Sequence, residues 1–258
     1  MQAIRIQCFQ NLANYRKPSS LIIKETYPLP PYSTVIGMVH RACDFKEYHP
    51  MNVSIQGTNK GTISDLYTRY SFSFGTKYEE GRHQICVHDD KDYGVFKGIA
   101  YTELVCENHM VIHIVPKEED FDVILQGLRY PKQYLALGRH EDLVDIERVD
   151  AVNLSVKEEA YIVNDIYIPL SLIKDEKEEN FWDDEEEDEG LFPKMDAGRG
   201  LAATIYTLNK EYEITKKGVR RWKREGGKIK AFYCPAGTKV NHILTDDFKN
   251  ENTPVMLA

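Results

Sequence analysis

A run of three prolines within residues 28–31 constrains this chain more than any other stretch of its sequence. Proline fixes the backbone φ angle and lacks an N–H donor, so this segment forms an extended, rigid connection. Before it, residues 4–8 alternate apolar and polar side chains, which predicts a β-strand. After it, residues 35–42 have the length and apolar spacing of a helix, with Ser33 or Thr34 placed to cap it. The chain is therefore expected to open with a strand, a rigid loop and a helix.

The next hundred residues alternate between strand patterns and one further helix pattern. A helix is predicted for residues 118–128, which have apolar residues at helical spacing and an acidic first turn that suits the helix dipole. Strand patterns occur at residues 52–56, 68–74, 94–102, 110–115 and 143–154. This order predicts an α+β fold, a ferredoxin-like or RRM-like sheet carrying an inserted hairpin.

The inserted hairpin lies around residues 68–104. The stretch between its two strand patterns is polar and contains Gly75 and Gly81. A long polar excursion of this kind predicts a β-hairpin arm that leaves the sheet. We expect two domains: residues 1–155 form the RRM-like domain with its arm, and residues 156–258 form a small β-rich module.

The net charge of −8 is unevenly distributed along the chain. Residues 175–189 contain 11 acidic residues and one basic residue, and a like-charge run of this kind is expected to be disordered. Residues 194–239 contain 12 basic and 4 acidic residues. Binding of nucleic acid depends on local patches of charge, so the acidic total does not exclude it.

Cysteine spacing and hydropathy exclude several classes of protein. The five cysteines are far apart and form no C-x-x-C pair, which argues against a disulfide framework and against a thiolate zinc site. Reduced, mostly buried thiols are expected. No apolar run approaches the ~18 residues that a membrane-spanning helix needs, and no signal peptide is evident. A cytoplasmic protein without membrane contact is expected.

The sequence lacks the common motifs of catalytic and metal sites. The sequence has no phosphate-binding glycine loop and no hydrolase or metalloprotease motif, and neither a cofactor nor a metal is expected. His109 and His113 lie on a strand pattern, where residues four apart are ~13 Å from each other and do not share a metal. A metal-independent ribonuclease needs only a histidine base near a lysine or tyrosine. His83, His88 and His140 lie near basic residues, so this alternative stays open beside the expectation of no catalysis.

Basic residues interleaved with aromatic residues give the stronger signal. Cations neutralise phosphates, and aromatic rings or guanidinium planes stack on unpaired bases. One such segment carries little weight, but several in one chain favour RNA binding. They are Tyr15-Arg16-Lys17, Tyr67-Thr68-Arg69-Tyr70, Lys77-Tyr78 and Arg220-Arg221-Trp222-Lys223-Arg224.

Two separated motifs resemble those of one protein family. Thr26 to Val39 contains Tyr-Pro-Leu-Pro-Pro-Tyr-Ser-Thr-Val-Ile-Gly, and Leu135 to Asp142 contains Leu-Ala-Leu-Gly-Arg-His-Glu-Asp. In this order and about 100 residues apart, they resemble the marks of the fifth family of CRISPR-associated (Cas) proteins. The resemblance covers residues 1 to 155 best and is nearest to the type I-B subfamily.

The resemblance implies a role in the Cascade surveillance complex. There a subunit of this kind grips the 5′ handle of the CRISPR RNA (crRNA), and its hairpin thumb contacts the first backbone subunit. The large subunit, which recognises the protospacer-adjacent motif (PAM) of target DNA, docks beside it. In type I-C the equivalent protein cuts the crRNA precursor, whereas in type I-B a separate endoribonuclease does so. A non-catalytic RNA-binding subunit is therefore expected; a precursor-processing ribonuclease and a pure protein scaffold are the alternatives.

Candidate RNA-binding residues follow from the motifs and the basic segments. A helix N-terminus at Ser33 and Thr34 would offer free N–H groups to phosphate, the alternative being a simple cap. Gly138 permits a positive φ or close backbone approach, and Arg139 carries a planar donor fork suited to phosphate. The alternative for Arg139 is a salt bridge with Glu141 or Asp142. The remaining candidates are Arg16, Lys17, Arg69, His140 and, in the thumb, Lys77, Arg82 and Lys91.

Overall fold

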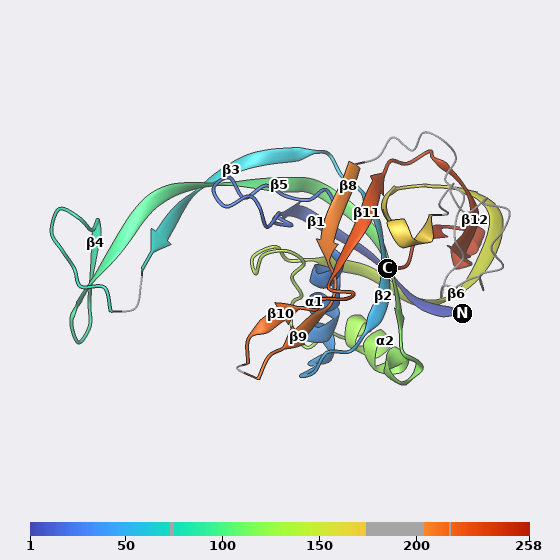
Figure 1. The fold of residues 1–258 in the computed structure, drawn as a ribbon, viewed down its shortest axis with the longest axis horizontal. Helices are drawn as coiled ribbons and strands as arrows, with labels where there is room; N and C mark the ends of the chain where they lie inside the picture. The colour runs from blue at the N-terminus through green and yellow to red at the C-terminus, as the bar shows by residue number, and fades with distance from the viewer. Residues whose placement is uncertain (73–74, 174–203, 217) are drawn as a thin grey trace, which may run out of the picture.

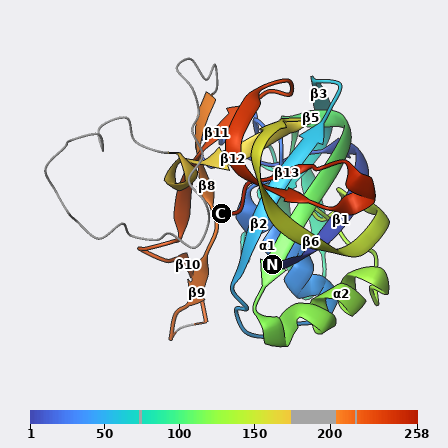
Figure 2. The ribbon, with the colours of Figure 1, turned by 90° about the vertical axis from the view of Figure 1, so that its right-hand side faces the viewer.

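A single large antiparallel sheet dominates the computed structural model, which describes residues 1–72, 75–173, 204–216 and 218–258. The acidic tract at 175–189 lies outside the described residues. Two helices, α1 (Tyr32–Cys43) and α2 (Phe121–Arg129), pack against each other and cover one face of the sheet (Figure 2). Within the described ranges, no helix is long and apolar enough to cross a membrane.

Four strands form the centre of the sheet. Each pairs antiparallel with its neighbour, and Ile112 on one strand is opposite both Ile6 and Ile55 on the flanking strands. These three side chains are fully buried in the main core, together with the apolar faces of α1 and α2. In spatial order the four strands are β6 (Asp145–Tyr161), β1 (Gln2–Ala13), β5 (Asp92–Pro116) and β2 (Met51–Thr58).

Strands from the C-terminal part extend this sheet at both ends. The expected domain boundary at residue 155 falls inside β6, which pairs with β1 through its first half and with β12 through its second. Beyond β2 lie β7 (Asp165–Pro169), β11 (Lys228–Cys234) and β8 (Thr204–Asn209), and beyond β6 lie β12 (Lys239–Asp246) and β13 (Pro254–Val255). Three short 3-10 helices are η1 (Glu118–Asp120), η2 (Leu170–Leu172) and η3 (Phe248–Asn250). A separate ribbon joins β9 (Tyr212–Ile214) to β10 (Arg220–Trp222).

The expected hairpin arm projects far from the body (Figure 1). Strand β3 (Thr62–Ser71) pairs with the outer half of β5, and β4 (Ile85–His88) closes the tip against the first residues of β5. The predicted strands at 94–102 and 110–115 are one continuous strand. Glu107 has a φ of 46°, at the point where β5 passes from the arm into the central sheet.

Helix α1 begins at Tyr32, before both of the residues that were predicted to cap it. The N-cap is Pro31, which has no side-chain donor or acceptor, so capping by Ser33 or Thr34 was wrong. Both lie inside the first turn, and the Thr34 N–H already donates to the Pro31 carbonyl at 2.9 Å. The fixed φ of proline orders this helix start without a side-chain cap.

A buried polar triad ties β12 to β1 and β5. The Asp246 carboxylate accepts hydrogen bonds from Arg5 Nε at 3.1 Å and from His113 Nε2 at 2.8 Å. The side chains of Asp246 and His113 are fully buried, and that of Arg5 is 5% exposed. Burial lowers the pKa of His113 below its ordinary 6.5, so this imidazole is neutral in the folded protein.

Stability is therefore expected to fall as the pH drops below about 6.5. The unfolded chain binds a proton at His113 there and the folded chain does not, which favours unfolding at lower pH. Urea denaturation between about pH 7 and about pH 5 measures the slope. His113→Gln should flatten it, although His40, whose pKa burial also lowers, leaves a residual slope. His242→Asn, at an exposed position, should leave the slope unchanged; equal slopes in all three proteins would contradict the assignment.

Candidate nucleic-acid interface

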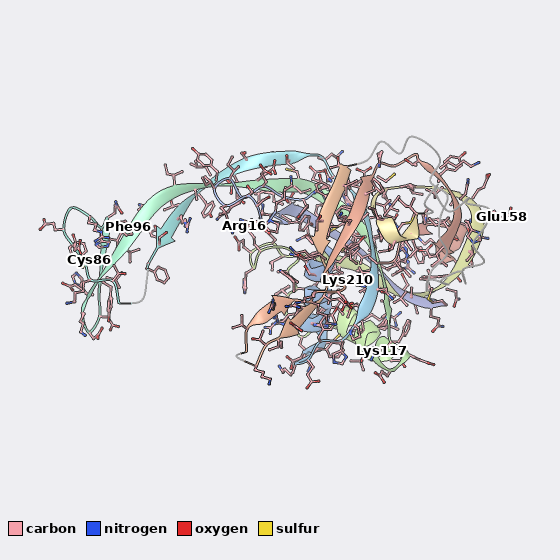
Figure 3. The ribbon with its side chains drawn as sticks, viewed as in Figure 1. Arg16, Cys86, Phe96, Lys117, Glu158 and Lys210 are labelled. Atoms are coloured by element: carbon pink, nitrogen blue, oxygen red, sulfur yellow. The ribbon has the colours of Figure 1, made fainter. Side chains whose placement is uncertain are left out.

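The segment after β1 folds back on itself at the root of the arm. Arg16 and Thr26 form an antiparallel bridge, and Lys17 N–H donates to the Glu25 carbonyl at 2.8 Å. Asn14 fastens this loop to β5, because its Nδ2 donates to the Lys24 carbonyl at 2.8 Å and to the Glu103 carbonyl at 2.6 Å. The loop thus lies beside the arm where the arm leaves the sheet (Figure 3).

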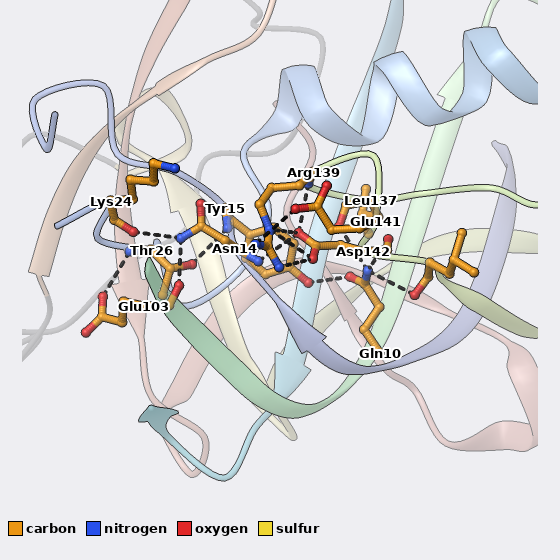
Figure 4. Close-up of polar contacts among 11 residues, drawn as sticks. Gln10, Asn14, Tyr15, Lys24, Thr26, Glu103, Leu137, Arg139, Glu141 and Asp142 are labelled. Atoms are coloured by element: carbon orange, nitrogen blue, oxygen red, sulfur yellow. Dashed lines mark hydrogen bonds and ion pairs between the residues drawn. The ribbon is translucent and has the colours of Figure 1, made fainter. Parts of the chain in front are cut away.

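The second family motif packs on the same segment (Figure 4). Asp142, which is buried, accepts hydrogen bonds from the backbone N–H of Asn14 at 2.9 Å and of Arg139 at 2.8 Å. Gln10 donates to the carbonyls of Leu137 and Asp142, both at 2.9 Å. These contacts join two segments that are 127 to 132 residues apart in the sequence.

Gly138 occupies a backbone conformation that only glycine adopts easily. Its φ is 119°, and a Cβ there would come within 2.8 Å of Asp142 Oδ2 and 3.0 Å of the Asn14 carbonyl oxygen. The expected positive φ and close approach are both present. The glycine is needed for contact between the two loops rather than for a ligand alone.

Gly138→Ala is accordingly expected to lower the free energy of unfolding by about 1–3 kcal/mol and to weaken RNA binding, because the loop must move away from Asn14. Chemical denaturation and filter binding on the same preparation measure both. The matched control is Gly37→Ala in α1, where a Cβ has no neighbour within 4 Å. That change should stabilise the helix by about 0.5–1 kcal/mol. Equal effects of the two substitutions would contradict this account.

Arg139 forms the salt bridges that sequence analysis left open as its alternative role. Its Nη2 lies 2.7 Å from Asp142 Oδ1, and its Nη1 lies 3.1 Å from Glu141 Oε1. The hydrogen bond to Asp142 raises the pKa of Arg139 further. The donor fork is therefore engaged inside its own loop, and Arg139 offers a ligand its charge and its partly exposed outer edge.

Positive charge converges between the folded-back loop, the arm and the Arg139 loop. Burial lowers the pKa of Lys24 below its ordinary 10.5, and so do the positive charges of Arg16, Arg69 and Arg139. The Lys24 ammonium also lies 4.5 Å from the centre of the Tyr67 ring on β3. We name Arg16, Lys24, Arg69 and Arg139 the root cluster. Arg16, Arg69 and Arg139 were predicted from the sequence. Lys24 was not predicted, because its neighbours in sequence are Ile23 and Glu25.

The other predicted RNA-binding residues are not members of the root cluster. Lys17 and His140 are next to Arg16 and Arg139 in sequence, and Lys17 pairs with Glu25 at 3.5 Å. Ser33 and Thr34 belong to α1. Lys77, Arg82 and Lys91 lie in the outer part of the arm, where Lys77 bridges Tyr93 and Arg82 pairs with Glu79 at 3.0 Å.

A second polar cluster, which sequence analysis missed, lies at the other end of α1. His49 Nδ1 is 3.0 Å from the Asp120 carboxylate, and His40 Nδ1 is 3.4 Å from the Tyr212 hydroxyl. The His49 ring stacks on Phe45 with centroids 3.7 Å apart. The spacing of these residues along the chain gave no signal, because three separate segments supply them.

Comparison with known proteins agrees with the motifs. The family described as CRISPR-associated protein (Cas_Cas5) matches residues 3–199. The chain belongs to this family. No curated protein sequence matches it.

Comparison with solved structures finds CRISPR proteins. The crystal structure of a CRISPR protein from Archaeoglobus fulgidus has a TM-score of 0.50 and 10% identity, covering 100% of this chain and 99% of that one. A chain of a CRISPR RNA-guided surveillance complex has a TM-score of 0.49 and 15% identity, covering 92% and 91%. At these identities the likeness to the Archaeoglobus protein concerns the fold.

Proposed function

We propose that this family member is a non-catalytic subunit of a type I Cascade complex, of the type I-B kind, that holds the 5′ handle of the crRNA. The observation that carries the proposal is the root cluster. It gathers four cations from three segments of the chain around the base of a projecting arm. Family membership supplies the setting, a CRISPR ribonucleoprotein.

The electrostatics of the root cluster favour a polyanion. Neighbouring cations repel one another, and the charges of Arg16, Arg69 and Arg139 add to burial in lowering the pKa of Lys24. A phosphate backbone would relieve this repulsion and release its own counterions. Tyr67, beneath Lys24, adds a ring on which an unpaired base can stack. We also propose a ferredoxin-like arrangement for the core. The strand order β6-β1-β5-β2 supports it, since α1 follows β1 and α2 follows β5.

The arm supports the proposed protein partners. Exposed large apolar side chains share one face of β3 and the outer half of β5, namely Leu66, Tyr70, Ile99 and Tyr101. An apolar surface of this kind marks a protein contact. We assign this surface to the Cascade backbone subunit. The large subunit docks beside the root of the arm. Target DNA near the PAM contacts the large subunit and is reached by this chain only indirectly.

Ultraviolet crosslinking of crRNA in the assembled complex tests this proposal. Adducts are expected on peptides that contain Lys24, Tyr67 and Arg139. A pure scaffold would give no adducts from the N-terminal part of the chain, and that outcome would refute RNA binding at the root cluster.

Processing of the crRNA precursor is the second candidate function, and the histidine cluster favours it. A histidine oriented by a carboxylate, as His49 is by Asp120, is suited to act as a general base. Burial lowers the pKa of His40, which keeps that ring neutral beside Tyr212. Incubation of the purified chain with repeat RNA and EDTA decides between the two. Cleavage at one position, lost in His49→Asn but retained in His242→Asn, would replace the non-catalytic proposal.

A further inference from the structure

The tip of the arm is a tight hairpin that brings three metal-binding residue types onto one face. Strand β4 pairs with the start of β5, with Cys86 opposite Gly94 and His88 opposite Asp92. Paired residues share a face, and so do residues two apart on a strand. Cys86, His88 and Asp92 therefore point to the same side, at the far end of the molecule, where Cys86 is labelled in Figure 3.

The ligand atoms are close enough to share one ion. Cys86 Sγ lies 3.9 Å from His88 Nδ1, and His88 Nδ1 lies 2.6 Å from Asp92 Oδ1. All three ligand atoms lie within 4.8 Å of one another. Around a tetrahedral zinc ion, sulfur, nitrogen and oxygen ligands at about 2.0–2.3 Å are about 3.3–3.6 Å apart. Small side-chain rotations therefore convert the observed arrangement into a coordination shell.

The buried His83 ring bounds one side of the cluster. Gly94, opposite Cys86, has no side chain, and the His83 ring fills the place of one, since a Cβ there would come within 2.5 Å of that ring. His83 does not serve as a further ligand through Nδ1, because this atom accepts a hydrogen bond from the Glu79 N–H at 3.0 Å.

The charge of the cluster suits a dication. Asp92 supplies a carboxylate, and a dication bound by Cys86 would displace the thiol proton, as metals do for cysteine ligands in general. Asp89 and Asp90 in the connecting turn add further negative charge, against the single cation Lys91.

We propose that Cys86, His88 and Asp92 bind one divalent transition-metal ion at the arm tip, with zinc as the best fit. The mixed sulfur, nitrogen and oxygen donor set selects zinc over magnesium or calcium. Three protein ligands leave the fourth tetrahedral position to water. In the part of the chain that the structure describes, no other group of three such residues comes this close together. The ion would fasten β4 to β5 and hold the tip in one shape, independently of RNA binding at the root.

Titration of the full chain with Co²⁺ tests the site, because a thiolate ligand gives a charge-transfer band in the near ultraviolet. Saturation at one equivalent is expected, with displacement of the band by Zn²⁺. Cys86→Ser should abolish the band, and His88→Asn and Asp92→Asn should each weaken affinity by at least about tenfold. These side chains lie at an exposed hairpin, so circular dichroism should show unchanged folding.

The matched control is Cys106→Ser, a partly exposed cysteine on β5 outside the cluster, which should keep the full signal. A band that survives in Cys86→Ser would place the thiolate ligand elsewhere and overturn the proposal. Absence of any charge-transfer band in the unaltered chain would overturn it as well.

Discussion

Replacing Asp246 with alanine is expected to lower the free energy of unfolding by about 3–5 kcal/mol, because it leaves the buried Arg5 guanidinium without its counterion. Arg5 Nη1 already lacks a hydrogen-bond partner among the described residues. His113 would lose the acceptor for its Nε2–H in the same step. Since the Asp246 side chain joins β12 to β1 and β5, in addition to the backbone pairing of β12 with β6, the C-terminal strands should loosen first. Urea denaturation followed by circular dichroism measures the loss.

The neighbouring Asp247 provides the matched control. It is exposed and accepts hydrogen bonds from the backbone and side chain of Asn153, so Asp247→Ala should cost about 1 kcal/mol or less. Combined replacement of Arg5, His113 and Asp246 by apolar residues of similar volume should recover much of the loss, because no buried charge then remains unpaired. Equal losses for Asp246→Ala and Asp247→Ala would contradict the role of the triad.

Reversing the charge at two members of the root cluster should have the largest effect on RNA affinity. For Arg16→Glu with Arg69→Glu, we expect binding of the 5′ handle to weaken about 100-fold or more, since a contact between a cation and phosphate contributes about 1.5–3 kcal/mol. The dependence of log affinity on log salt should also flatten by about two. Both side chains are exposed, so folding should not change.

Filter binding over a range of salt concentrations gives both quantities. The control makes the same change of charge away from the root, at Lys132 after α2 and Lys157 on β6, both exposed. Lys132→Glu with Lys157→Glu should alter affinity only slightly through the net charge. If both double variants weaken binding to the same extent, RNA is held by general charge and not by the root cluster.

The opening of the fold could be predicted because its signals are local. Alternation in residues 4–8, prolines at 28–31 and apolar spacing in residues 35–42 each act within a few residues, and β1 and α1 confirm them. The exact start of α1 was missed, since Pro31 fixes the helix entry without the side-chain cap on which the prediction relied. The continuity of β5 was missed as well, because the irregularity at Glu107 resembles a break in the alternation.

The site was only partly predictable because long-range contacts build it. Arg139 lies within three residues of both of its carboxylate partners in the sequence, yet only the structure shows that both of them bind its guanidinium. Lys24 carries no aromatic or basic neighbour in sequence, and it joins the root cluster because Asn14 fastens its loop to β5. His40 lies on α1, His49 in the loop after it and Asp120 in η1, and the three are brought together by tertiary contacts.

The most direct measurement compares the affinity of the complex for handle RNA and for a scrambled RNA of the same length and composition. The complex should be assembled with this chain, and the salt concentration should be held fixed. We predict at least about tenfold tighter binding of the repeat-derived handle, about 1.4 kcal/mol, with the preference lost in the Arg16→Glu and Arg69→Glu double variant. Equal affinity of the complex for the two RNAs would contradict the claim that this chain holds the 5′ handle.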